Sequence, residues 1–123
     1  MVSERPEVIA IVDDDLAMRN SLISLLSNYG YRAESYGSAA DFLASAATTR
    51  AVCLLLDVQL GGTTGIELAR QLAAAGRNFR IVFMTGSDSE TFQRDAAAMG
   101  CKDYLRKPFP AERLMTAIRK ALR

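Results

Sequence analysis

The feature of this sequence that most restricts its fold is a fivefold alternation of short β-rich runs with amphipathic helical patterns. We expect strands at Val8–Asp13, Arg32–Tyr36, Ala51–Asp57, Arg80–Thr85 and Asp103–Arg106. Apolar residues at helical spacing predict helices at Leu16–Tyr29, Ala39–Ala46, Gly65–Ala75, Glu90–Met99 and Ala111–Leu122. Strict alternation of strand and helix in one chain predicts an α/β fold, a parallel sheet sandwiched between two helical layers.

The composition of the strands indicates their places in the sheet. The runs VIAIV, AVCLLL and IVFM are continuously apolar, as expected for strands that are buried on both faces. RAESY and DYLR are more polar, which favours the edges of the sheet. The first helix is expected to bury one face, made of Met18, Leu22, Leu25, Leu26 and Tyr29.

Helix ends are marked by capping residues. Ser38, Thr64 and Ser87 each precede an acidic residue by three positions, a pattern typical of capping boxes. Three glycines stand where left-handed C-caps would end helices: Gly30, Gly76 and Gly100.

Length, charge and cysteine content limit the classes of function. The 123 residues predict a single domain over 1–123, and 15 basic against 14 acidic residues give no excess that favours nucleic-acid binding. The longest apolar run, 51–56, is too short to span a bilayer, and the N-terminus lacks the apolar stretch of a signal peptide, so a cytoplasmic location is expected. Cys53 and Cys101 are too few for a disulfide framework and are interpreted as packed residues.

The chain contains no histidine, which excludes histidine-based triads and histidine-liganded metals. Its chemistry must therefore depend on carboxylates, Lys, Thr, backbone groups or a metal ion.

Polar residues stand at the carboxyl ends of four predicted strands. These residues are Asp13-Asp14-Asp15, Asp57, Thr85 and Lys107. Because the carboxyl ends of parallel strands share one edge of the sheet, we expect these groups to converge there. Clustered carboxylates need a proton or a cation, and oxygen ligands favour Mg²⁺ or a similar ion such as Mn²⁺. A carboxylate can also attack phosphorus to form an acyl phosphate, so the pattern predicts a site for a divalent cation and a phosphoryl group.

The motifs IVDDD, LLLDVQL, VFMTG and DYLRKPF, in this order, resemble those of response regulator receiver domains from about Val8 to Leu122. The resemblance implies a doubly wound, flavodoxin-like (βα)5 fold with strand order 2-1-3-4-5. It implies a phosphoacceptor signalling switch rather than an enzyme acting on a separate substrate. The phosphoryl donor would be a histidine kinase or a histidine phosphotransfer protein, and output would be altered partner binding or homodimerisation.

The resemblance also assigns a role to individual residues. Asp57 would be the phosphoacceptor, Asp14 would bind Mg²⁺ directly, Asp13 would bind it mainly through water, and Gln59 would offer its backbone carbonyl.

Three further roles concern the phosphoryl group and the response to it. Lys107 would pair first with Asp57 and then with the phosphoryl oxygens. Thr85 would hydrogen-bond a phosphoryl oxygen, and Tyr104 would change rotamer on activation. The Lys107–Pro108 bond would be cis, a form that is inexpensive only before proline.

Several residues have simpler interpretations. Asp15 is better explained as the N-cap of the first helix than as a ligand. Tyr104 could pack at an edge strand, and Asp57 with Lys107 could form an ordinary buried salt bridge. Where the family commonly has a proline after the acceptor, this chain has Gly61 and Gly62, which predicts a more mobile loop.

Three other functions compete with a phosphorylation switch. A haloacid-dehalogenase-like phosphatase would use Asp13 as nucleophile but would need a late acidic pair, which is lacking. A flavodoxin-like flavin binder would have its phosphate repelled by the first acidic turn. A degenerate receiver would bind partners without phosphorylation. Whether the chain is a stand-alone receiver or part of a longer regulator stays open.

Overall fold

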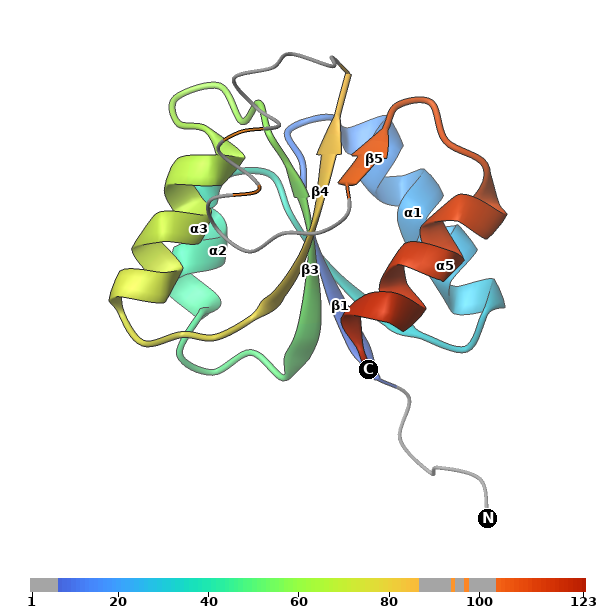
Figure 1. Cartoon of the computed structure of the whole chain (residues 1–123), viewed down its shortest axis with the longest axis horizontal. Helices are drawn as coiled ribbons and strands as arrows, with labels where there is room; N and C mark the ends of the chain where they lie inside the picture. The colour runs from blue at the N-terminus through green and yellow to red at the C-terminus, as the bar shows by residue number, and fades with distance from the viewer. Residues whose placement is uncertain (1–6, 87–93, 95–96, 98–103) are drawn as a thin grey trace.

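A computed structural model of the chain describes residues 7–86, 94, 97 and 104–123, which form a parallel sheet between two helical layers (Figure 1). The strands are β1 Val8–Val12, β2 Arg32–Tyr36, β3 Ala51–Asp57, β4 Arg80–Thr85 and β5 Tyr104–Arg106. The helices with described bounds are α1 Leu16–Asn28, α2 Ala39–Ser45, α3 Gly65–Ala74 and α5 Ala111–Ala121. The strand order is β2-β1-β3-β4-β5, so the predicted three-layer parallel fold is confirmed, with the two polar strands at the edges.

The three central strands are apolar throughout because their alternating side chains enter two different cores. Ile9, Ile11 and Leu55 point into the core beneath α1 and α5, whereas Ala10 and Leu56 point into the core beneath α2 and α3. Figure 1 shows these two helix pairs on opposite faces of the sheet. Cys53 is fully buried in the first of these cores, as its apolar context predicted.

Element bounds agree with the sequence predictions to within one residue at most ends. Two predictions need correction. Asp13 follows β1 rather than ending it, because the chain turns there: the Asp15 backbone N–H donates to Asp13 Oδ1 (2.9 Å), and strand pairing ends at Val12. Tyr29 was expected on the buried face of α1 but is 46 % exposed, because it lies past the last helical residue, at the C-cap.

The capping residues act as predicted where the structure describes them. Side-chain oxygens of Asp15, Ser38 and Thr64 accept hydrogen bonds from the first turns of α1, α2 and α3, respectively. Gly30 and Gly76 follow their helices with φ of 87° and 76°.

Some predicted features fall outside the described residues. These are Ser87, Gly100, Cys101 and the Glu90–Met99 helix, apart from Arg94 and Ala97, which are helical. Within the described part of the chain, no helix is long and apolar enough to cross a membrane.

Candidate functional site

The carboxyl ends of the strands bring four functional groups together at one rim of the sheet. Asp13 follows β1, Asp57 and Thr85 are the last residues of β3 and β4, and Lys107 follows β5. Asp13, Asp57 and Thr85 are the buried polar or charged residues of the described chain, at 0, 8 and 4 % exposure. Burying carboxylates costs free energy unless they are paired, so this cluster needs a chemical explanation.

Lys107 links the two buried carboxylates. Its ammonium nitrogen donates to Asp13 Oδ2 at 2.8 Å and to Asp57 Oδ2 at 3.1 Å. Its backbone N–H donates to the Thr85 carbonyl at 2.7 Å, and the Lys107–Pro108 peptide is cis, as predicted. Burial by itself would lower the pKa of Lys107, but the hydrogen bonds to the two carboxylates outweigh it and raise the pKa above 10.5. The side chain is therefore a fixed positive charge at neutral pH.

The Asp57 carboxylate is held at both oxygens. Oδ1 accepts from the Gln59 backbone N–H (3.1 Å), and Oδ2 accepts from Lys107. Burial raises the pKa of Asp57 above 3.8, and the nearby Asp13 charge adds to this, whereas the bonds from Gln59 and Lys107 oppose it. Asp57 is thus an oriented and poorly solvated carboxylate at the end of a rigid strand, which are the properties of a nucleophile.

The acidic residues are close enough to share a cation. One carboxylate oxygen from each of Asp13, Asp14 and Asp57 lies within 4.8 Å of the others. Asp14 is exposed whereas the other two are buried, so the cluster opens to solvent on one side. All three ligands are hard oxygen atoms, so the residues present fit Mg²⁺ or a similar divalent ion.

Gln59 is placed next to the cluster by its backbone. Its N–H is bonded to Asp57, and the residue forms an antiparallel bridge with Thr64 across a tight loop. Its carbonyl as a metal ligand remains a prediction.

The acidic turn is anchored by Arg19, a residue that the sequence analysis did not single out. Arg19 Nη1 donates to the Asp13 backbone carbonyl at 2.7 Å. A Cβ on Gly37 would lie 3.1 Å from the same guanidinium nitrogen, so a glycine leaves room for it. A cation one turn into the helix that follows an acidic run is the sequence signal that could have indicated this contact.

Two glycines shape the loop after Asp57. A Cβ on Gly65 would clash with the Asp57 backbone carbonyl, so only glycine allows α3 to begin this close to Asp57. Gly61 has a φ of 81°, a conformation that favours glycine. The departure from proline therefore supplies a left-handed turn, and the mobility expected of this loop remains a prediction.

Thr85 and Tyr104 lie on the neighbouring strands β4 and β5. Thr85 ends β4 and is buried. Tyr104 begins β5, is half-buried and packs against the core beneath α2 and α3. Its edge-strand packing is thus observed, while its rotamer switch and the Thr85 hydrogen bond to a phosphoryl group stay predictions.

Comparison with known proteins was made on both sequence and structure. The family model for the response regulator receiver domain matches residues 9–119. The chain is 36 % identical over 122 residues to the response regulator protein TodT of Pseudomonas putida, covering 99 % of this chain and 54 % of TodT. It is also 36 % identical over 115 residues to the transcriptional regulatory protein FixJ of Bradyrhizobium diazoefficiens, covering 94 % of this chain and 56 % of FixJ. The chain thus spans about half the length of the curated relatives that it matches.

Solved structures share the fold over nearly the whole chain. A CheY-like receiver domain protein from Methanospirillum hungatei has a TM-score of 0.88 at 26 % identity, covering 96 % of this chain and 94 % of that one. A response regulator receiver protein from Burkholderia phymatum has a TM-score of 0.82 at 34 % identity, covering 96 % and 95 %.

Proposed function

This chain belongs to the response regulator receiver domain family, and we propose that Asp57 is the residue on which it accepts a phosphoryl group. Receiver domains of this family are phosphoacceptor switches of two-component signalling. The observation that carries the assignment is that Asp57 is buried, held at both oxygens, and bonded to a lysine shared with a second carboxylate. A salt bridge made only for stability would not need the second and third carboxylates beside it.

The proposed reaction is the transfer of a phosphoryl group from a donor to the buried Asp57 carboxylate. An Asp57 oxygen attacks the phosphorus of a phosphohistidine or a small acyl phosphate. A carboxylate O–P bond forms while the P–N or P–O bond of the donor breaks, and the leaving group departs on the far side. Such transfers depend mainly on positioning and charge stabilisation, which the Gln59 amide and the Lys107 ammonium supply.

Asp13, Asp14, Asp57 and the Gln59 carbonyl are the groups that would hold a divalent cation, with Mg²⁺ preferred and Mn²⁺ as a substitute. When bound, the ion supplies positive charge to the phosphoryl oxygens and offsets repulsion among the carboxylates. Once Asp57 carries the phosphoryl group, Lys107 would move from Asp57 toward the phosphoryl oxygens, because the carboxylate charge that it neutralised is lost in the acyl phosphate (mixed anhydride) bond.

The signal is read through Thr85 and Tyr104. The Thr85 hydroxyl bonds a phosphoryl oxygen, and the resulting shift at the end of β4 lets Tyr104 change rotamer at the neighbouring edge strand. Because β4 and β5 pair at Phe83–Tyr104, a movement of β4 would displace β5 as well.

We propose one receiver domain over residues 1–123, located in the cytoplasm, with a histidine kinase or histidine phosphotransfer protein as donor. The chain catalyses only its own phosphorylation and dephosphorylation. Output is altered partner binding or homodimerisation, and direct binding of nucleic acid by these residues is not expected.

The test is intact-mass analysis after incubation with acetyl phosphate and Mg²⁺. We expect one phosphoryl adduct that requires the metal and is absent in Asp57→Asn. The matched control is Asp41→Asn, which removes an exposed carboxylate on α2 and should leave the adduct unchanged. Peptide mapping locates the label.

Two outcomes would refute the assignment. A label on Asp13 would favour a phosphatase-like use of the first acidic turn. An adduct that survives in Asp57→Asn, with the variant folded, would mean that the acceptor lies elsewhere.

A further inference from the structure

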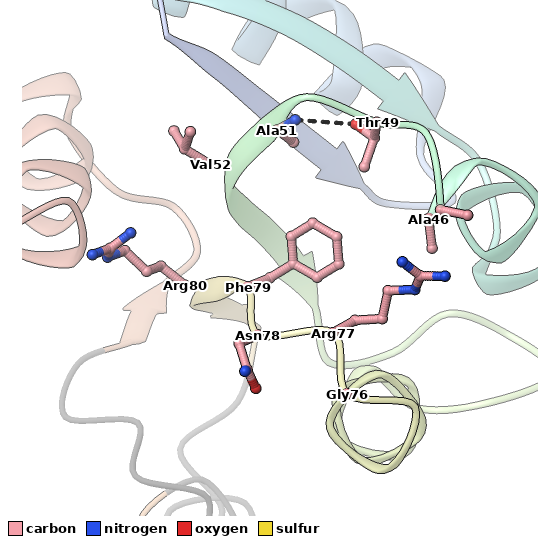
Figure 2. A pocket seen from close by; sticks show the side chains of 10 residues that line it. Ala46, Thr49, Ala51, Val52, Gly76, Arg77, Asn78, Phe79 and Arg80 are labelled. Atoms are coloured by element: carbon pink, nitrogen blue, oxygen red, sulfur yellow. Dashed lines mark hydrogen bonds between the residues drawn. The ribbon is translucent and has the colours of Figure 1, made fainter.

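The opposite end of the sheet from Asp57 carries a basic hollow, which we call the basal hollow. It lies at the amino ends of β3 and β4, has a volume of about 370 Å³, and is lined among others by Ala46, Thr49, Ala51, Arg77, Phe79 and Arg80. Figure 2 shows the Phe79 ring between the two arginines, with the Arg77 side chain extending past it toward Ala46. β3 has seven residues, so at about 3.3 Å per residue the hollow lies roughly 20 Å from the acceptor.

The charged residues that line the hollow are all basic. Its lining contains Arg77 and Arg80, both exposed, and no carboxylate. Within residues 7–86, 94, 97 and 104–123, neither guanidinium lies within ion-pair distance of an acidic group. A guanidinium group binds carboxylates in a planar, bidentate geometry, so two of them at one concavity, with no acidic residue in its lining, fit an anionic ligand.

The positive charge continues along the same edge. A second hollow of about 320 Å³ is lined by Arg32 and Arg50 at the amino ends of β2 and β3. Its one carboxylate, Glu34, is already an acceptor for the hydroxyls of Tyr36 (2.9 Å) and Thr49 (2.6 Å). Four arginines at this edge outnumber Glu34 and Glu7, so the basal edge is basic, in contrast to the acidic rim, although the whole chain has a net charge of only +1.

The floor of the basal hollow is apolar. Phe79 is half-buried, packs edge-on against Phe42 with ring centroids 5.5 Å apart, and is bordered by Ala46 and Ala51. The Thr49 hydroxyl donates to Glu34 and accepts from the Ala51 N–H (3.1 Å), so it is occupied (Figure 2). A ligand that complements this site has carboxylates for the guanidinium groups and an apolar side chain for the floor.

We propose that the basal hollow docks an acidic segment of a partner protein, with carboxylates on Arg77 and Arg80 and an apolar side chain over Phe79. A free inorganic anion would leave the apolar floor uncovered. A nucleic acid would gain little from two arginines on a chain whose opposite rim is acidic. Because the hollow and Asp57 lie at opposite ends of β3, a partner can occupy the hollow while another protein contacts Asp57. Docking therefore does not depend on the proposed phosphorylation.

The test is a ¹H–¹⁵N NMR titration of the whole chain with a capped octapeptide of aspartate and glutamate around one central phenylalanine. We expect shifts confined to amides in 46–52 and 76–80. Arg77→Gln combined with Arg80→Gln should weaken binding about tenfold, at roughly a factor of three for each partly exposed ion pair. The control, Arg119→Gln combined with Lys120→Gln on the exposed face of α5, removes the same charge and should change affinity less than twofold.

A second pair of variants leaves both arginines in place. Ala47→Glu adds a carboxylate to the lining and should abolish binding, whereas Ala47→Gln, of equal size, should not. Asp57→Asn should bind as well as the wild type, so a failed phosphorylation test leaves this result interpretable. Three results would each overturn the proposal. The first is an equal loss of peptide affinity in the α5 control, and the second is binding of inorganic phosphate or a short oligonucleotide as tight as that of the peptide. The third is the absence of chemical-shift changes at the hollow.

Discussion

Removing the Lys107 charge should destabilise the protein through the carboxylates it leaves behind. Lys107 is the cation that bonds both Asp13 and Asp57, and its side chain is 22 % exposed. Lys107→Met keeps an apolar stem of similar length but leaves Asp13, Asp14 and Asp57 without that charge. Their ligand oxygens lie within 4.8 Å of one another, so the variant isolates the electrostatic role of the ammonium.

The expected magnitude follows from the geometry. Two unit charges 4.8 Å apart repel by about 3.5 kcal/mol at an effective dielectric constant of 20. Water reaches the exposed side of the cluster, and Asp57, whose pKa is already raised by burial, can take up a proton to relieve the strain. We therefore expect the free energy of unfolding to fall by about 2 kcal/mol at neutral pH, somewhat below the usual cost of breaking a fully buried pair.

Urea unfolding followed by circular dichroism measures this loss. The experiment uses four proteins: the wild type, Lys107→Met, Asp57→Asn and the double variant. Each is unfolded once in the presence of a chelator and once in excess Mg²⁺. If repulsion causes the loss, Mg²⁺ should restore most of it, and Asp57→Asn should remove at least half of it. A loss that is unchanged by Mg²⁺ and equally large in the Asp57→Asn background would refute the reasoning and assign the effect to packing of the lysine stem.

Three further predictions concern local geometry and titration. Gly65→Ala should lower the free energy of unfolding by at least about 2 kcal/mol and slow phosphorylation, because its Cβ would clash with the Asp57 carbonyl. Gly62→Ala, with nothing within 4 Å of its Cβ, should change the free energy of unfolding by no more than about 0.5 kcal/mol, and urea unfolding and adduct rates compare the two variants. Because burial raises the pKa of Asp57, the free energy of unfolding of the metal-free protein, relative to that of Asp57→Asn, should fall as pH rises from 3.8 through the folded-state pKa and then level off. A rise of the urea midpoint across that pH window would contradict the burial effect. The Cys53 thiol is fully buried, and burial raises its pKa to about 12. In a Cys101→Ser background it should therefore react with a thiol reagent only as fast as the protein unfolds, and immediate labelling would disprove this protection.

The fold was predictable because its elements depend on local patterns. The apolar runs of β1, β3 and β4 require cover on both faces, and alternation with helices leaves few arrangements other than a parallel sheet. The placement of Tyr29 failed because helical spacing continues beyond the point where the chain leaves the helix at Gly30.

The sequence predicted which side chains meet at the rim of the site, but not how they bond to one another. That Asp13, Asp57, Thr85 and Lys107 share one edge follows from strand direction alone. That one ammonium bonds two carboxylates, or that Arg19 holds the Asp13 carbonyl, depends on rotamers and loop paths that no spacing encodes.

The two ends of β3 place opposite charges at the two edges of one rigid element. Asp57 ends the strand at the acidic rim, and Ala51 begins it at the basic hollow. Between them Cys53, Leu54 and Leu55 are fully buried and hydrogen-bonded into neighbouring strands on both sides, so the strand has no room to move as a unit. If Asp57 is phosphorylated as we propose, we expect the change of charge to be transmitted sideways, through β4 to the edge strand β5, rather than down β3. We therefore expect the basal hollow to keep its shape in either state, which would suit it to hold a partner in place while the rim carries the proposed signal.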